Sequence, residues 1–340
     1  MKIDKKIILW LNISIGVLFL MIFIGGMTRL TDSGLSMVTW KPLTGIIPPI
    51  GNEEWEFSFS QYKAYPEYKI INYNITLSQY KYIYYWEYIH RMLGRLIGFL
   101  FIIPFGYFLY KKSLSNQLIK KLIIVFIMGG FQGFLGWYMV KSGLVDIPHV
   151  SHYRLAIHLT MAFLILSYIY KLKLSILFTK NIKGIKDNAF YEKLLTLILV
   201  LLFIQVVYGA FNAGIKTVNI VNVFPFYNGG FKSAFLGLEK YFLFFLDNDY
   251  GVQFMHRSLA FILVGLISFF IIKVNKVTER IKLENQYLVV LILFQCIIGI
   301  LTLVTKAAVV FAILHQFLAI VTILFVIKIK HKLRYEINEI

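Results

Sequence analysis

Eight apolar segments, each about as long as a membrane-crossing helix, constrain this chain of 340 residues more than any other feature. A helix needs about 20 predominantly apolar residues to cross the hydrocarbon core of a bilayer. The segments span approximately residues 7–27, 90–110, 119–140, 153–176, 190–210, 254–274, 286–305 and 309–328. The composition agrees, because only 15% of the residues are charged, against about a quarter in a soluble domain. We therefore predict an all-α integral membrane protein embedded in the lipid bilayer.

The distribution of basic residues predicts which side of the membrane each loop faces. An even number of crossings places both termini on one side, and the loops on that side hold most of the 35 Lys and Arg residues. Short cytoplasmic loops are enriched in Lys and Arg, so both termini are predicted to be cytoplasmic. The net charge of +18 then reflects topology and not nucleic-acid binding. The first segment is too long for a signal-peptide core, and we expect a multi-pass protein of the bacterial plasma (inner) membrane.

The chain contains an internal repeat. His90-Arg91 corresponds to His256-Arg257, Gln132 and Gly136 correspond to Gln295 and Gly299, and His158 corresponds to His315, at offsets of 166, 163 and 157 residues. Each half holds four segments of the same orientation, as in transporters built from parallel repeats. We predict two pseudo-symmetric four-helix bundles, residues 1–180 and 181–340, and expect the long aromatic outer loop 28–89 to form an ordered cap on the membrane surface.

Four of the seven histidines lie in the apolar segments, near the predicted outer side and within about the first two turns of each helix. They are His90, His158, His256 and His315. A small residue follows each by four positions on the same helix face, which would let a flat macrocycle lie beside an axial imidazole. A helix–helix hydrogen bond is the alternative for a lone intramembrane histidine. The duplicated pairs favour two sites in which histidines on facing helices ligate one haem iron.

The charged side chains beside these histidines have two interpretations each. Arg91, Arg95 and Arg257 could bind haem propionates, because a guanidinium pairs bidentately with carboxylates, or could extend to the membrane interface. Glu87 lies one turn before its histidine. It could act as an acid/base group or proton relay, or it could form an interfacial salt bridge with Arg91.

Several motifs together resemble the haem A synthase family. They are Gly25-Gly26 with Thr28, Arg29, Thr31, Ser33, Gly34 and Ser36; Trp40, Pro42, Gly45 and Pro48-Pro49; Glu87 with His90, Arg91, Gly94 and Arg95; Gln132-Gly133, Gly136 and Trp137; and Gln253 with His256-Arg257. The resemblance covers nearly the whole chain. It is closest to the proteobacterial and mitochondrial branch, which lacks a cysteine pair in the first outer loop, as this chain does. The segment 213–219 keeps only part of the family pattern.

The resemblance implies an enzyme of cytochrome oxidase assembly that oxidises the C8 methyl of haem O to the formyl of haem A, through hydroxylated intermediates and with water supplying the oxygen. It implies a haem b cofactor on His256 and His315. It also implies a haem O substrate site with His90 and His158, where Glu87 takes part in catalysis. The sites are expected toward the periplasmic side. Expected partners are haem O synthase (a farnesyltransferase) and an unidentified electron acceptor, and a homo-oligomer is left open.

From the residues alone, two other functions stay open. A di-haem b-type membrane cytochrome that takes electrons from quinol would have the same histidine pairs, but no need of Glu87 beside one of them. A transporter with parallel repeats would have helices broken near the midplane. Pro104 is the only proline inside a predicted helix, so the transporter is disfavoured and the enzyme is the preferred interpretation.

Overall fold

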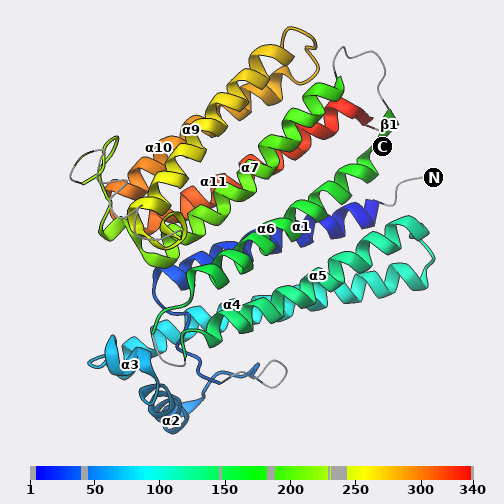
Figure 1. The fold of residues 1–340 in the computed structure, drawn as a ribbon. Coiled ribbons are helices and arrows are strands. Elements are labelled where there is room, and N and C mark those ends of the chain that lie inside the picture. The colour runs from blue at the N-terminus through cyan, green and yellow to red at the C-terminus, as the bar shows by residue number, and fades with distance from the viewer. Residues whose placement is uncertain are drawn as a thin grey trace. The chain divides into compact units, whose positions relative to one another are not determined.

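A computed structural model describes residues 5–39, 45–144, 148–181, 188–228, 230 and 243–337 of the chain. The motif residues Trp40 and Pro42 lie outside these ranges. The chain divides into two compact units. The N-terminal unit is Asn12–Ile165, and the C-terminal unit is Leu166–Ile340 together with Met1–Leu11. Each unit is described by itself, and the ribbon is drawn in Figure 1.

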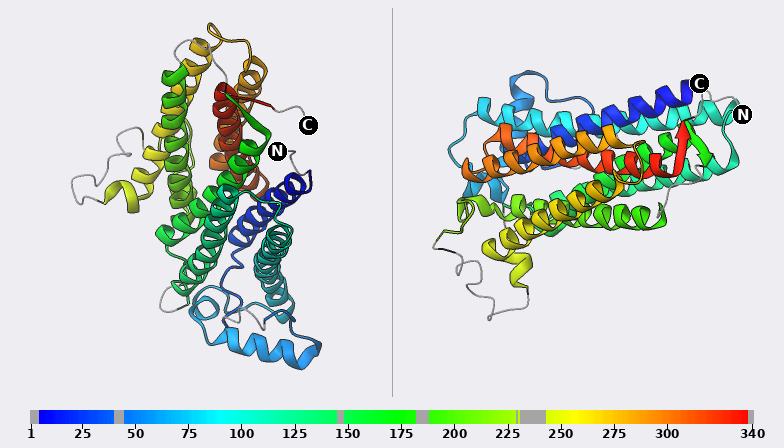
Figure 2. Two further views of the ribbon diagram at one scale, coloured as in Figure 1. Left: turned by 90° about the vertical axis from the view of Figure 1, so that its right-hand side faces the viewer. Right: turned by 90° about the horizontal axis from the view of Figure 1, so that it is seen from above.

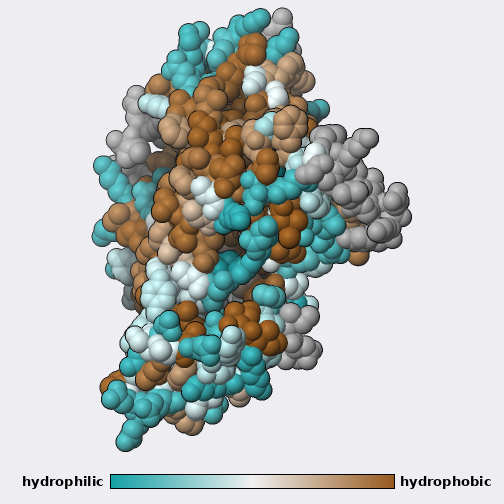
Figure 3. All heavy atoms as spheres, turned by 90° about the vertical axis from the view of Figure 1, so that its left-hand side faces the viewer, coloured by the Kyte–Doolittle hydropathy of each residue, from teal (hydrophilic) through white to brown (hydrophobic). Residues whose placement is uncertain are grey.

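Eight helices are long and apolar enough to cross a membrane, which confirms the eight predicted segments. They are α1 (Lys5–Leu30), α4 (Leu77–Tyr110), α5 (Asn116–Lys141), α6 (His152–Leu177), α7 (Asn188–Ile215), α9 (Asp249–Val274), α10 (Lys282–Val304) and α11 (Val309–Arg334). Large apolar side chains such as Phe99, Ile103 and Phe261 are exposed on them, and broad hydrophobic areas lie in the upper and middle part of the face drawn in Figure 3. Such areas are too large for a surface in water, so the chain is a multi-pass membrane protein.

The helix α4 begins at Leu77, well before the predicted apolar segment at residue 90. Thr76 caps it, because the Thr76 hydroxyl accepts from Gln79 N (3.3 Å) and Gln79 Oε1 accepts from Thr76 N (2.8 Å), a capping box. His90 therefore lies more than three turns into its helix, and the prediction of a position within the first two turns was wrong for it. The prediction holds for the other three histidines, since α6, α9 and α11 begin close before them.

The outer segment between α1 and α4 is ordered in its described part around aromatic side chains. It contains α2 (Gly51–Lys63) and α3 (Pro66–Ile70), and α2 lies crosswise to the long helices of its own unit (Figure 2). Its core consists of buried rings: Trp55, Phe59, Tyr62, Tyr80 and Tyr84. We call these five residues and the two short helices the aromatic cap. The ordered cap predicted from the aromatic content is present, and its position on the membrane surface stays a prediction.

In the C-terminal unit, α7 packs against α9 and α11, and α10 packs against α11. The outer segment after α7 contains the 3₁₀ turn η1 (Thr217–Asn219) and the short helix α8 (Phe244–Asp247). Two strands that the sequence did not predict, β1 (Phe178–Asn181) and β2 (Tyr335–Ile337), pair antiparallel. They join the chain after α6 to the chain after α11, so these two helix ends lie together. Strands of three or four residues are too short to show a period-two pattern.

Candidate functional site

Each of the four histidines predicted as site residues faces a glycine of a neighbouring helix. The pairs are Gly25 of α1 with His90 of α4, Gly136 of α5 with His158 of α6, Gly209 of α7 with His256 of α9, and Gly299 of α10 with His315 of α11. A Cβ atom built on these glycines would lie 3.0 Å from Nε2 of His90, 3.0 Å from Cε1 of His158, 3.5 Å from Cε1 of His256 and 2.7 Å from Cε1 of His315. Glycine thus allows the close approach of each imidazole to the adjacent helix.

The C-terminal unit brings His256 and His315 together. Their ring centroids are 6.3 Å apart and their planes are inclined at 65°. Metal–nitrogen bonds to imidazole are about 2 Å long, so two imidazoles that bind one metal from opposite sides have centroids about 6 Å apart. The predicted pair therefore has the spacing of two axial ligands of one iron.

The N-terminal unit contains the other predicted pair. His90 lies on α4 and His158 on α6, each against a glycine of a neighbouring helix. No cluster of three or more His, Cys, Asp or Glu side chains that could hold a bare metal ion occurs in the described ranges. What the chain offers in this unit, as in the other, is a pair of imidazoles, which suits a metal already held by a macrocycle.

Glutamine side chains lie against three of the four histidines. Gln132 Nε2 donates to the main-chain carbonyl of His158 (3.1 Å), and Gln205 Nε2 donates to that of His256 (3.0 Å). The Nε2 atoms of Gln132, Gln205 and Gln295 lie 3.5, 3.4 and 3.5 Å from the ring Nε2 of His158, His256 and His315, respectively. Each glutamine precedes the contacting glycine by four residues, so both lie on one helix face. Gln132 and Gln205 therefore form hydrogen bonds across helices.

Several buried polar atoms around the pairs lack a protein partner. In the part of the chain that the structure describes, these include Nδ1 of His158, His256 and His315 and Oε1 of Gln132, Gln205 and Gln295. A buried polar atom without a hydrogen bond calls for an explanation such as an unseen ligand. Together with the spacing of the C-terminal pair, the orphaned imidazole nitrogens fit a haem group at these positions.

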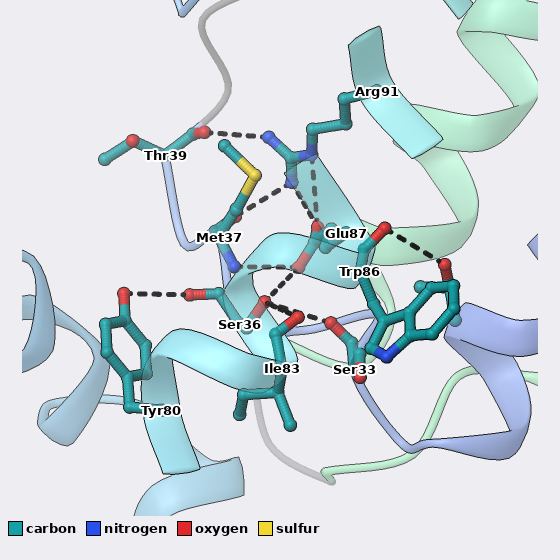
Figure 4. Close-up of polar contacts among 10 residues, drawn as sticks. Ser33, Ser36, Met37, Thr39, Tyr80, Ile83, Trp86, Glu87 and Arg91 are labelled. Atoms are coloured by element: carbon teal, nitrogen blue, oxygen red, sulfur yellow. Dashed lines mark hydrogen bonds and ion pairs between the residues drawn. The ribbon is translucent and has the colours of Figure 1, made fainter. Parts of the chain in front are cut away.

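Glu87 lies on α4 one turn before His90, with 2% of its surface exposed. Its Oε1 accepts from Nε (3.1 Å) and Nη2 (2.6 Å) of Arg91. Its Oε2 accepts from Ser36 Oγ (2.8 Å) and from the main-chain N–H of Met37 (2.8 Å), as Figure 4 shows. These four bonds fill the capacity of an ionised carboxylate. The salt bridge to Arg91, one of the two interpretations of the sequence, is present, and the acid/base role stays a prediction.

Arg91 also holds the loop that follows α1. Its Nη1 donates to the carbonyl of Thr39 (3.0 Å) and its Nη2 to the carbonyl of Met37 (2.8 Å) (Figure 4). Ser36 Oγ, whose single proton goes to Glu87, also lies 3.3 Å from the carbonyl oxygen of Ile83 on α4. The carboxylate and the guanidinium therefore clamp the loop 33–39 onto α4.

Gln253 and Arg257 form the same arrangement in the C-terminal unit. Arg257 Nε donates to Gln253 Oε1 (3.3 Å), and its Nη1 and Nη2 donate to the carbonyls of Phe226 (3.0 Å) and Val223 (2.9 Å). Gln253 is buried and donates to Thr217 Oγ1 (2.9 Å). In the C-terminal unit a neutral amide therefore accepts the hydrogen bond from the arginine, whereas in the N-terminal unit a carboxylate accepts it.

The remaining predicted arginine, Arg95, donates from Nη1 to Sδ of Met92 (3.6 Å). Arg257 also stacks over the Tyr227 ring, 4.5 Å from its centroid. Burial raises the pKa of the Tyr227 phenol, and the Arg257 charge opposes that shift. Propionate binding by Arg91, Arg95 and Arg257 stays a prediction.

Sequence reasoning missed two parts of the site. Ser36 and Met37 meet Glu87 because the loop returns over α4, which no local pattern reveals. Gln205 and Gly209 repeat the four-residue spacing that was recognised on α5 and α10, and a search for that spacing would have found them.

Comparison with known proteins gives matches along almost the whole chain. Residues 8–327 match the cytochrome oxidase assembly protein family. The haem A synthase of Flavobacterium psychrophilum is 40% identical over 328 residues, which cover 94% of this chain and 96% of the relative. The haem A synthase of Nitrosospira multiformis is 40% identical and covers 98% and 94%, and that of Rickettsia bellii is 39% identical and covers 95% and 97%. The matched range includes all four histidines.

Proposed function

This chain belongs to the cytochrome oxidase assembly protein family, and on that premise we propose that it is a haem A synthase. The reaction converts the C8 methyl group of haem O to the formyl group of haem A in two hydroxylation steps. In the net reaction the methyl carbon gains one oxygen atom from water, and the methyl group and the water together release four electrons and four protons. One observation carries the proposal: the histidine pair recurs, and among the described residues only the N-terminal pair has a buried carboxylate, Glu87, beside it.

That asymmetry distinguishes the two sites. Haem O is assigned to His90 and His158 in the predicted domain 1–180, where the clamp contains Glu87. Haem b is assigned to His256 and His315 in the domain 181–340, where the clamp contains an amide. Haem b, when bound, supplies a one-electron centre through which electrons leave the substrate site toward the unidentified acceptor.

Glu87 is the proposed acid/base group. Arg91 holds Oε1 from two nitrogens, so the proton is accepted at Oε2, which then gives up one of the two hydrogen bonds that it accepts in this structure, from Ser36 Oγ and Met37 N. The Ser36 hydroxyl donates to this Oε2 (2.8 Å), so it is the next atom along a proton relay. The clamp at the same time fixes the carboxylate close to the histidine that follows it by one turn, and orientation of this kind contributes to catalysis.

The parallel internal repeat of two four-helix bundles is part of the proposal. Its support is local: the glycine–histidine contacts and the arginine clamps recur within each unit. We place the protein in the bacterial plasma membrane with cytoplasmic termini and periplasmic haem sites, from the Lys and Arg distribution. Haem O synthase is the proposed donor of the substrate. The di-haem cytochrome alternative is not favoured, because the relatives are haem A synthases.

The test combines haem extraction with matched variants. The purified protein should contain haem b together with haem O, its hydroxylated form or haem A, identified by pyridine-haemochrome spectra and mass analysis. Glu87→Gln should keep both haems and the bond to Arg91, because the amide oxygen of Gln253 accepts from Arg257 in the same way, and it should abolish haem A formation. Gln253→Glu, the reciprocal control, should still form haem A.

Two results would contradict the proposal. Haem b alone at both sites, in cells that make haem O, would favour an electron-transfer cytochrome. Normal haem A output from Glu87→Gln would remove the catalytic assignment. Separately, His256→Ala and His315→Ala should deplete haem b, and retention of the full haem b spectrum would reverse the assignment of the halves.

A further inference from the structure

The position one turn before each contacting glycine distinguishes His90 from the other three histidines. On α5, α7 and α10 this position holds a glutamine, whose amide nitrogen lies 3.4 to 3.5 Å from the ring Nε2 of the histidine. On α1 the same position, four residues before Gly25, holds Met21. A glutamine one turn before the contacting glycine therefore occurs beside three of the histidines and is replaced by Met21 beside His90.

The four imidazoles approach their glycines in the same way. The outer edge of each ring lies 2.7 to 3.5 Å from a Cβ atom built on the glycine, in His90 as in the other three. What separates His90 is therefore the side chain on the adjacent helix and not the position of its ring.

The chemistry of the two side chains explains the difference. A glutamine amide donates two hydrogen bonds, and at Gln132 and Gln205 one of them goes to the main-chain carbonyl of the histidine itself. This bond ties the helix that carries the histidine to its neighbour at the position of the histidine. A methionine thioether donates none and is conformationally adaptable. The Met21 methyl group lies 3.6 Å from a Cβ atom built on Gly94, one turn after His90 on α4, so Met21 packs against this helix without a hydrogen bond that would fix it.

We propose that Met21 makes His90 the exchangeable axial ligand of the N-terminal site, whereas the glutamines hold the other three histidines in place. This inference rests on the proposed function, which makes the N-terminal pair a substrate site where haem O must enter and haem A must leave. The C-terminal pair has a glutamine at both ligands and retains its cofactor. Met21 and the three glutamines are positioning residues, since they act through the histidines.

The test measures haem release from the full-length protein in detergent to excess apomyoglobin. The wild type should release haem in two phases, a fast one from the N-terminal site and a slow one from the C-terminal site. Met21→Gln should slow the fast phase about fivefold to tenfold, the size of one net hydrogen bond, and leave the slow phase unchanged. Gln205→Met should accelerate the slow phase by a similar factor. Met21→Leu is the matched control, and it should release haem like the wild type.

The outcomes are distinguishable from failure of the proposed function, because release is followed without turnover. Equal fast phases in Met21→Gln and Met21→Leu would overturn the inference, even in a protein that forms haem A. A slow phase unchanged by Gln205→Met would overturn it as well, and this variant keeps the test decisive if Met21→Gln does not fold. Absence of haem A in the wild type would instead count against the proposed function.

Discussion

A Cβ atom on Gly299 of α10 would lie 2.7 Å from Cε1 of His315 on α11. Real side chains essentially never approach this closely, so one of the two helices or the imidazole has to move when residue 299 carries a side chain. Gly299 is therefore part of the arrangement that positions His315, because any side chain at this position would displace the imidazole or one of the helices.

Gly299→Ala should loosen the C-terminal haem. Overpacking of this kind costs about 1–3 kcal/mol, so retention of haem b should fall by roughly tenfold or more, measured by haemochrome content per purified protein. Gly209→Ala is the matched control, because its Cβ would lie at an ordinary 3.5 Å from His256. Equal haem content in the two variants would contradict the steric argument.

Glu87→Ala should destabilise the outer part of the N-terminal unit as well as the chemistry. It leaves the side chain of Arg91, which is 12% exposed, and the donors of Ser36 and Met37 without their acceptor. Removal of one partner of a buried ion pair costs about 3–5 kcal/mol. Limited proteolysis within the loop 33–39 should become faster than in Glu87→Gln, and similar cleavage rates in the two variants would show that the clamp does not hold the loop.

Trp55→Ala should unfold the aromatic cap locally. The Trp55 ring is buried and packs edge-on against Tyr84, with centroids 5.0 Å apart. Loss of a buried Trp costs about 3–5 kcal/mol, and hydrogen exchange of the α2 amides should report it. Phe57, on the same helix but 67% exposed, provides the control: Phe57→Ala should change the stability by less than about 0.5 kcal/mol.

The cap should lose stability at alkaline pH because of Tyr62. Burial, and then the Glu67 charge, raise the pKa of the Tyr62 phenol above its ordinary value of 10.0. The folded cap therefore binds this proton more tightly than the unfolded chain does, so the contribution is complete below about pH 10 and declines as the pH rises further. Hydrogen exchange of α2 measured across about pH 9 to 12 should show this decline.

Two tyrosine variants check that assignment. Tyr62→Phe should reduce the alkaline decline, although it removes the hydrogen bond from the Tyr62 hydroxyl to Glu67 (2.9 Å). Tyr73→Phe, which changes an exposed ring, should leave the decline as in the wild type. An alkaline decline of undiminished size in Tyr62→Phe would assign it to other groups.

Hydropathy and residue spacing were enough to predict the eight long helices, because a membrane helix satisfies its backbone hydrogen bonds within one segment. They also pointed to the four histidines as candidate haem ligands, which stays a prediction, and to His256 and His315 as a pair, whose rings lie together in the structure. The predicted start of α4, at residue 90, was wrong for a local reason. The capping box at Thr76 and the buried side chains of Tyr80 and Tyr84 extend the helix beyond its apolar part.

The partners of these side chains depended on the tertiary structure. Which glycine faces His90, which loop atoms meet Glu87, and that β1 pairs with β2 are contacts between residues far apart in the chain. Packing between membrane helices depends on the shape of small residues at close range and not on hydrophobicity, so the apolar pattern carries little information about it. The sequence thus specified the helices and the candidate ligands, and the three-dimensional packing specified what holds each ligand in position.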